Sequence, residues 1–268
     1  MAGGLAHNPF ATIRKGRLHL KRRDALELTP QLKQLRQTIE GALPLVRIED
    51  LLMQVDRWCG FTQVFRRPGE RMPRIPHFTK TLLATFIAHG TNLGIAAMAH
   101  SVDDVTADML QDMSQWCLRE DTLKAANARL VNFHHRIPLS AVWGDGTISS
   151  SDGQRFGLQA SSLLGSLYPR YFGCYEQALT VYTHVADQHS VLHTQVIACS
   201  VREAIYVLDG LLNNDTVLRP KEHFVDQHGF TDQLFGLCHL LGFSLMPRLN
   251  VTKQLLYKLD RTQSYGDL

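Results

Sequence analysis

The chain has 268 residues, of which 44% are apolar and 20% charged, so it can bury a substantial core, and its composition argues against disorder over most of its length. Its five cysteines are odd in number, scattered and without a CxxC pair, which argues against a disulfide framework and against a zinc site. The first residues, MAGGLAHNPF, lack the plan of a signal peptide, and no apolar run is long enough to span a bilayer. We therefore expect a soluble protein of the cytoplasm with reduced cysteines.

The net charge of +3 is unevenly distributed along the chain. Residues 1–77 hold 14 Lys and Arg against 7 Asp and Glu, whereas residues 78–268 hold 14 against 18. The run RKGRLHLKRR contains no acid, as expected of a segment that contacts phosphates, although a solvated arm has the same composition. Both interpretations stay open for its six cations, which are Arg14, Lys15, Arg17, Lys21, Arg22 and Arg23.

The first half of the chain carries the apolar period of amphipathic helices. Five helices are predicted. The first begins at Pro30 behind a Thr29 cap, the second ends at Gly60, and the fourth begins behind a Thr106 cap. Such stripes more often face a core than a binding partner. The apolar stripes lie at residues 32–43, 48–59, 82–87, 109–117 and 123–133.

The pattern changes near His134 to short strands that alternate with helices. Residues 179–185 and 191–197 alternate as a hairpin across the polar break ADQHS. A helix is predicted behind a capping box at Ser200 to Glu203, then a strand ending at Asp226, a helix capped by Thr231, and a last strand at SLMPRL. The fold class is therefore α/β, with a helical, basic region at residues 1–137 followed by a mixed sheet with flanking helices at residues 138–268.

Several long motifs of this second region occur in a recognisable order. They are WGDGTISSSDGQRF, THVADQHSVLHTQVI, REAIYVLDGLL, EHFVDQHGFTDQLFGLCHLLGF and MPRL, and they resemble the catalytic domain of the Tn-three family transposases. The upstream motifs ALPLVRIEDLLMQVDRWCGF, HGTNLGIAAMAH and LVNFHHRIPL resemble the segment that precedes this domain in the family. The resemblance covers most of the chain and part of the family's length, and it implies a ribonuclease H-like domain that lacks its C-terminal part.

The resemblance also implies a DDE transposase, in which two aspartates and a glutamate hold two divalent metals. A metal pair can activate water and stabilise the leaving oxygen when a phosphodiester is cleaved, and Mg²⁺, for which Mn²⁺ can substitute, prefers carboxylate oxygens. The family places its first aspartate in the SSSDG element, here Asp152, and its second in a motif that matches HFVDQ, here Asp226. We expect both residues to be catalytic and to bind metal.

A second aspartate, Asp145, competes with Asp152 for the first position, because it ends the strand-like run SAVWGD. Its alternative role is that of a turn residue in an Asp-Gly pair. Around Asp152, glycines allow close approach of the backbone to a metal or phosphate, and the hydroxyls of Ser150 and Ser151 are predicted to contact DNA.

The histidines of the hairpin are the other candidate metal ligands. His184, His189 and His193 do not converge on the basis of strand alternation and are interpreted as ordinary hydrogen-bonded residues. Glu222 shares a strand face with Asp226 and could assist a metal, although a surface position is the simpler interpretation.

The family's glutamate has no match after Leu249, and its long N-terminal region for recognising transposon ends is absent from these 268 residues. The sequence therefore predicts either a fragment of a transposase that cleaves and joins DNA, or a remnant that binds DNA or oligomerises without catalysis. An unrelated hydrolase is disfavoured because no nucleophile motif is present. Expected partners are transposon-end and target DNA and further copies of the full-length protein, with no membrane, in a bacterial cytoplasm and at the nucleoid when DNA is bound.

Overall fold

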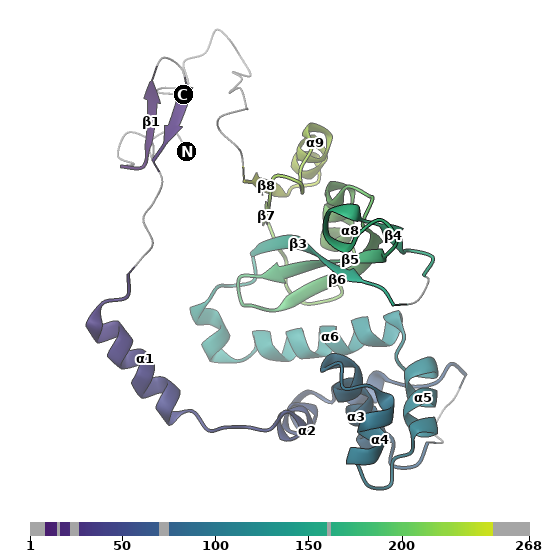
Figure 1. Cartoon of the computed structure of the whole chain (residues 1–268). Helices are drawn as coiled ribbons and strands as arrows, with labels where there is room; N and C mark the ends of the chain where they lie inside the picture. Colours follow the sequence, from purple (N-terminus) through teal and green to yellow (C-terminus); the bar gives the residue numbers. More distant parts are fainter. Residues whose placement is uncertain (1–8, 15–16, 22–26, 70–74, 160–161, 249–268) are drawn as a thin grey trace. The chain divides into compact units, whose positions relative to one another are not determined.

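The computed structural model describes residues 9–14, 17–21, 27–69, 75–159 and 162–248 (Figure 1). The chain divides into two compact units, one formed by Met1–Leu45 and Arg248–Leu268 and the other by Val46–Pro247. Among the described residues, no helix is both long and apolar enough to cross a membrane. A boundary between domains at residues 137 and 138 stays a prediction.

In the part of the first unit that the structure describes, the chain forms a two-stranded hairpin and one helix. Strands β1 (Ala11–Arg14) and β2 (Arg17–Leu20) pair antiparallel, a structure that the cationic run did not predict. Helix α1 spans Pro30–Ala42, and the Thr29 hydroxyl accepts a hydrogen bond from the Leu32 backbone N–H, which confirms the predicted cap. The apolar stripe of α1 is exposed, in contrast to the expectation that it faces a core.

The second unit begins with five helices, which are α2 (Ile48–Cys59), α3 (Phe78–Gly90), α4 (Ile95–Ser101), α5 (Ala107–Trp116) and α6 (Glu120–His135). The predicted ends of α2 and α5 are confirmed, because Gly60 takes the left-handed conformation with φ 63° after α2, and Thr106 caps α5. Helix α4 was not predicted. Buried side chains from α3, α5 and α6 and the short 3₁₀ helix η2 (Phe61–Val64) form the core of this part.

A mixed sheet follows, with short helical segments between its strands. Its strands are β3 (Ile148–Gly157), β4 (Ser166–Leu167), β5 (Gln177–Ala186), β6 (Val191–Ala198), β7 (Glu222–Val225) and β8 (Ser244–Pro247). The order is β4-β5-β3-β7-β8, and β6 also pairs with β5. β3, β7 and β8 run parallel, whereas β5 is antiparallel to both β3 and β6. The predicted hairpin and mixed α/β fold are confirmed.

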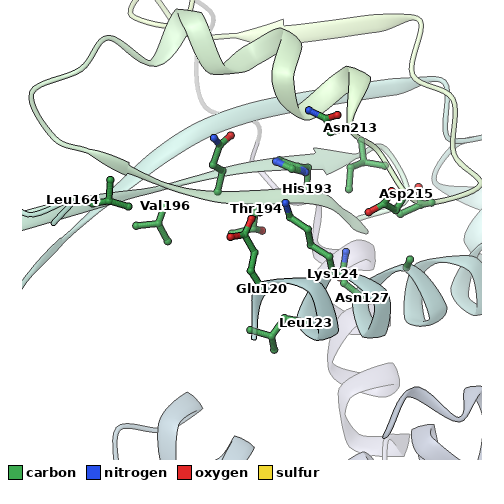
Figure 2. A pocket seen from close by; sticks show the side chains of 14 residues that line it. Glu120, Leu123, Lys124, Asn127, Leu164, His193, Thr194, Val196, Asn213 and Asp215 are labelled. Atoms are coloured by element: carbon green, nitrogen blue, oxygen red, sulfur yellow. Dashed lines mark ion pairs between the residues drawn. The ribbon is translucent and has the colours of Figure 1, made fainter. Parts of the chain in front are cut away.

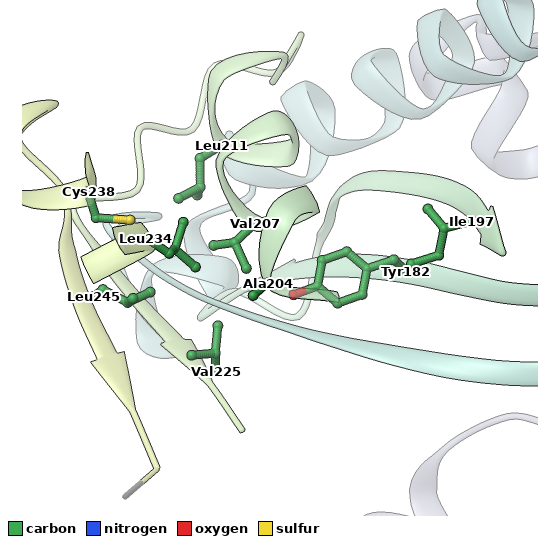
Figure 3. Close-up of a cluster of buried hydrophobic side chains, with 9 residues drawn as sticks. All are labelled: Tyr182, Ile197, Ala204, Val207, Leu211, Val225, Leu234, Cys238 and Leu245. Atoms are coloured by element: carbon green, nitrogen blue, oxygen red, sulfur yellow. The ribbon is translucent and has the colours of Figure 1, made fainter. Parts of the chain in front are cut away.

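One face of this sheet is covered by helices that connect its strands. These elements are the 3₁₀ helix η4 (Glu203–Tyr206), α8 (Val207–Leu212) and α9 (Asp232–Leu240). Their apolar side chains pack with Tyr182, Val225 and Leu245 of the sheet into one buried cluster (Figure 3). Helix α6, the last of the preceding helices, packs against β6 through a small buried cluster that includes Val131 and Leu192.

Two local predictions are wrong. The run SAVWGD is not a strand, because residues Pro138–Val142 form the 3₁₀ helix η3 and the strand begins only at Ile148. Ser200 to Glu203 does not form a capping box, because Arg202 precedes η4 and no side chain caps it. The Glu203 side chain instead contacts Arg155 of β3, so a tertiary ion pair replaces the local bond.

Candidate active site

Two aspartates that are 74 positions apart in the sequence lie side by side where the pairing of β3 with β7 ends, one within β3 and the other directly after β7. The two strands run parallel, and their last paired residues are Ser151 and Val225. Asp152 and Asp226 come next on each strand. Because neighbouring strands lie about 4.8 Å apart, the fold brings these two backbone positions together.

The two carboxylates differ in their surroundings. Asp226 is half-buried, and its Oδ1 accepts the backbone N–H groups of His228 and Gly229, each at 2.8 Å. Asp152 is exposed, and its Oδ1 accepts the N–H of Gly153 at 2.8 Å. Within the described residues, the second oxygen of each carboxylate makes no hydrogen bond. Such oxygens suit a hard divalent cation.

A third carboxylate, that of Glu203, lies close to this pair. It is 6% exposed, and its Oε1 accepts a hydrogen bond from Arg155 Nη2 at 3.0 Å. Burial raises the pKa of Glu203, Arg155 opposes that shift, and the charges of Asp226 and Asp152 raise the pKa further. The sequence did not indicate a role for Glu203 in the site, because the spacing from Ser200 to Glu203 matches a capping box.

Gly153 is required by the position of Glu203. A Cβ atom at this glycine would lie 2.5 Å from Glu203 Oε1 and 2.8 Å from Thr180 Cγ2, distances that real side chains do not tolerate. The glycine after Asp152 therefore permits close approach of a buried carboxylate, whereas the approach of a metal or phosphate stays a prediction.

A buried polar network lies beneath β3 and β7. The imidazole of His223 bonds to Ser149 Oγ through Nδ1 and to Ser151 Oγ through Nε2, both at 2.8 Å, and Ser151 Oγ also lies 2.6 Å from the Tyr182 hydroxyl. Burial lowers the pKa of His223 to about 3, so the ring is neutral, with one nitrogen donating and the other accepting. These bonds connect three strands next to the aspartates.

The serines before Asp152 point to opposite sides of the strand. Ser150 is exposed, which leaves its hydroxyl available to DNA, whereas Ser151 is only 7% exposed and its hydroxyl belongs to the buried network. The burial of Ser151 contradicts its predicted contact with DNA. Alternation along β3 decides the difference, and it could not be used before the strand's limits were known.

Asp145 lies in the loop before β3 and has the role of a turn residue. It is exposed, and its Oδ1 accepts the backbone N–H of Thr147 at 3.1 Å and the hydroxyl of Thr147 at 2.5 Å. The Thr147 hydroxyl is the main cause that lowers the pKa of Asp145. The loop is held in turn by Asp187, which accepts the N–H of Gly146 at 3.0 Å.

The three histidines of the hairpin do not form a metal site. His184 and His193 are buried with ring centres 5.9 Å apart, while His189 packs edge-on against Trp143. Across the described ranges, no group of three or more His, Cys, Asp or Glu side chains is arranged to hold a metal ion. The pair Asp152 and Asp226, whose role as metal ligands stays a prediction, offers fewer ligands than a metal pair takes.

The predicted phosphate-contacting run falls partly outside the described residues, which exclude Lys15, Arg22 and Arg23. Arg14 and Arg17 are partners across the β1–β2 hairpin, and Lys21, directly after it, is exposed. The hairpin therefore holds two of the six cations at one end.

A cavity of about 530 Å³ opens between α6 and β6 (Figure 2). Lys124 and Glu120 of α6 form an ion pair of 2.7 Å at its edge, and His193 of β6 lines it. Because β5 lies between β6 and β3, this cavity includes neither aspartate of the pair.

The chain was compared with known proteins to find its family. The family model described as "Tn3 transposase DDE domain" matches residues 50–268. The chain belongs to the Tn3 transposase family. It is 38% identical over 258 residues to the transposase for transposon Tn1546 of Enterococcus faecium, covering 96% of this chain and 26% of that protein. It is 42% identical over 209 residues to the transposase for transposon Tn3926 of Escherichia coli, covering 77% of this chain and 21% of the relative.

The chain thus spans about a quarter of the length of these Tn3-family transposases. Its sheet, with flanking helices, is the ribonuclease H-like fold that the family resemblance predicted. A solved structure, the Mos1 transposase paired-end complex with left transposon end, matches 84% of this chain and 74% of its own chain at 10% identity with a TM-score of 0.27, which is too low a similarity to support an argument.

Proposed function

We propose that this chain forms part of the catalytic region of a transposase that cleaves and joins DNA at transposon ends. The observation that carries the proposal is the juxtaposition of Asp152 and Asp226 on parallel strands in a member of the Tn3 transposase family. The two carboxylates would hold divalent metal, with Mg²⁺ as the natural ion and Mn²⁺ as its substitute. The metal, when bound, would supply charge neutralisation and an activated water.

The remaining residues of the site have supporting roles in this proposal. The backbone N–H groups of His228 and Gly229 fix one oxygen of Asp226 and leave the other for the metal. The His223 network ties β3 to β7 and so holds the two aspartates at a constant separation. Ser150, exposed beside Asp152, is placed to donate a hydrogen bond to a DNA oxygen.

In this proposal no residue of the chain is assigned as the third acid of the DDE set, and Glu203 is already engaged by Arg155. We therefore propose that residues 1–268 bind DNA, but do not nick a transposon-end duplex unless a further acidic ligand is supplied. Loss of one ligand from a site in which the metals both activate the nucleophile and stabilise the leaving oxygen removes nearly all turnover. The full-length protein would act on transposon-end and target DNA as a homo-oligomer.

The test uses a chimera in which this chain replaces the matching segment of the Tn1546 transposase. With Mg²⁺ we expect the chimera to cleave a transposon-end duplex. The variants Asp152→Asn and Asp226→Asn should reduce cleavage to background and retain DNA binding, because a carboxamide is a poor ligand for a hard cation.

The matched control is Asp145→Asn, which alters an exposed turn residue and should keep cleavage. Inactivity of Asp145→Asn together with activity of Asp152→Asn would show that the first metal ligand has been assigned to the wrong aspartate. Cleavage by the 268-residue chain alone would contradict the need for a further ligand.

A further inference from the structure

Four side chains near the far end of β3 form a continuous stack. The Arg155 guanidinium carbon lies 4.9 Å from the centre of the Tyr168 ring, the rings of Tyr168 and Tyr171 stack at 5.5 Å with 23° between their planes, and the Arg170 guanidinium carbon lies 5.4 Å from the Tyr171 ring. We refer to Arg155, Tyr168, Tyr171 and Arg170 as the stacked row. At each end of the row a guanidinium lies over a tyrosine ring, which is a favourable cation–π arrangement.

The inner end of the stacked row is held rigidly by the sheet. Arg155 belongs to β3 and makes an ion pair of 3.0 Å with the buried Glu203. Tyr171 lies in the short helix α7 (Pro169–Phe172), and the Phe172 ring of this helix packs against Gly157 of β3, where a Cβ would meet it at 3.2 Å. The row is therefore ordered before any ligand arrives, which reduces the entropic cost of binding.

The outer end of the row is open to solvent. Tyr171 is 61% exposed and Arg170 is also exposed, so part of an aromatic ring and a cation are both accessible. At the base, the buried atoms Arg155 Nε, Ser166 Oγ and Gln177 Oε1 have no hydrogen-bond partner within the described residues. Buried polar atoms are normally paired, so these three atoms are an exception within the described residues.

The row and the proposed metal site share strand β3 but not a face of it. Arg155 lies three residues beyond Asp152, a separation of about 10 Å at the rise of a β-strand. Since successive side chains of a strand point to opposite faces, this odd spacing puts the row on the face opposite to the Asp152 carboxylate.

Resting on the proposed function, we propose that the stacked row binds unpaired nucleotides of the DNA on which the transposase acts. Every base has a π face that can stack on an exposed tyrosine, and an arginine next to it adds attraction to both the base and the phosphate. Paired bases within a duplex offer no such face. The row therefore favours single-stranded over double-stranded DNA, and its positive charges are complementary to this ligand rather than to an apolar protein surface.

The test measures the affinity of the 268-residue chain by fluorescence anisotropy with two labelled probes, an oligo(dT) of about a dozen nucleotides and a duplex of arbitrary sequence. The variant Tyr171→Ala should weaken oligo(dT) binding roughly five- to a hundred-fold, the effect of losing one stacked base, and should leave duplex binding unchanged. Tyr171→Phe retains the ring and should bind like the wild type.

Tyr175→Ala is the matched control, because Tyr175 is 97% exposed in the same segment and lies outside the stacked row. It should not alter either affinity. Unchanged oligo(dT) affinity in Tyr171→Ala, with duplex binding intact, would overturn the role of the row and leave the proposed function standing. The same would follow from an equal loss in Tyr175→Ala or an equal loss for both probes. Binding of neither probe by the wild type would overturn the proposed DNA contacts as well.

Discussion

The residues around Asp152 show how one position can be constrained by a partner far away in the sequence. Gly153 lies in β3 opposite Tyr182 of β5, and the buried Glu203 carboxylate occupies the space where a side chain would be. Glu203 in turn is placed by its ion pair with Arg155. A glycine for which the sequence predicts close approach to a metal or phosphate is thus part of a tightly packed region of the sheet.

Gly153→Ala should destabilise the protein by about 1–3 kcal/mol, the usual cost of forcing additional atoms into a packed site, because the new methyl group collides with Glu203 and Thr180. The measurement is the free energy of unfolding in urea. Gly236→Ala is the matched control, since Gly236 lies in α9 with no atom within 4 Å of the added Cβ, and alanine should stabilise that helix by roughly 0.5–1 kcal/mol. Equal effects of the two substitutions would contradict the close contact with Glu203.

At the scale of elements, the β1–β2 hairpin is the part of the chain with the clearest electrostatic expectation. Arg14 and Arg17 pair across it, and Lys21 follows it with its backbone N–H bonded to Phe10 O at 2.7 Å. The cationic run is therefore not wholly an irregular arm, because Arg14 and Arg17 flank the turn of the hairpin and Lys21 follows its open end. Whether the run contacts phosphates stays a prediction.

We expect the affinity for duplex DNA to fall with salt at a slope of log K against log salt near −5, if all six cations of the run contact phosphates at roughly 0.9 per contact. Deletion of residues 1–24 should weaken binding and bring the slope close to zero. The double variant Lys33→Gln and Arg36→Gln is the control, because Arg36 of α1 is already paired with Glu40 at 2.7 Å and should contribute little. A deletion with unchanged affinity and slope would refute the role of the run.

At the scale of the whole molecule, buried histidines connect stability to pH. His223 and His184 are both fully buried, with rings stacked 5.2 Å apart. Burial lowers their pKa values from 6.5 to about 3 and about 4, respectively. The unfolded chain binds protons near pH 6.5 whereas the folded chain does not, so the stabilisation is present above pH 6.5 and is lost as the pH falls toward 4 and then 3.

The free energy of unfolding should therefore decrease steeply below about pH 6, with each of these histidines contributing about 1.4 kcal/mol per pH unit. His184→Phe removes the titrating imidazole and should reduce that slope, although its ring is larger and it loses the bond from Nε2 to the Val207 carbonyl. His100→Gln is the control, because His100 is exposed and should not change the slope. Urea denaturation at several pH values measures the effect, and an unaltered slope in His184→Phe would contradict it.

The sequence by itself determined the features whose causes lie within a few residues. The caps at Thr29, Thr106 and Thr231 and the helix end at Gly60 were predicted correctly, because each depends on a side chain or a backbone conformation next to the helix end. The hairpin was predicted for the same reason, since its strands are adjacent in the sequence and share a period of two.

Only the tertiary structure decided which polar residues are inside and which acids meet. Along β5 the buried face carries Thr180, Tyr182 and His184 rather than the leucine and valines between them. Alternation shows that the strand has two different faces, but the helices that pack on the sheet decide which face is buried. Asp226 was matched by family motif alone. Its place beside Asp152 depends on the parallel pairing of β3 with β7, a set of backbone hydrogen bonds across more than seventy positions that no local pattern encodes.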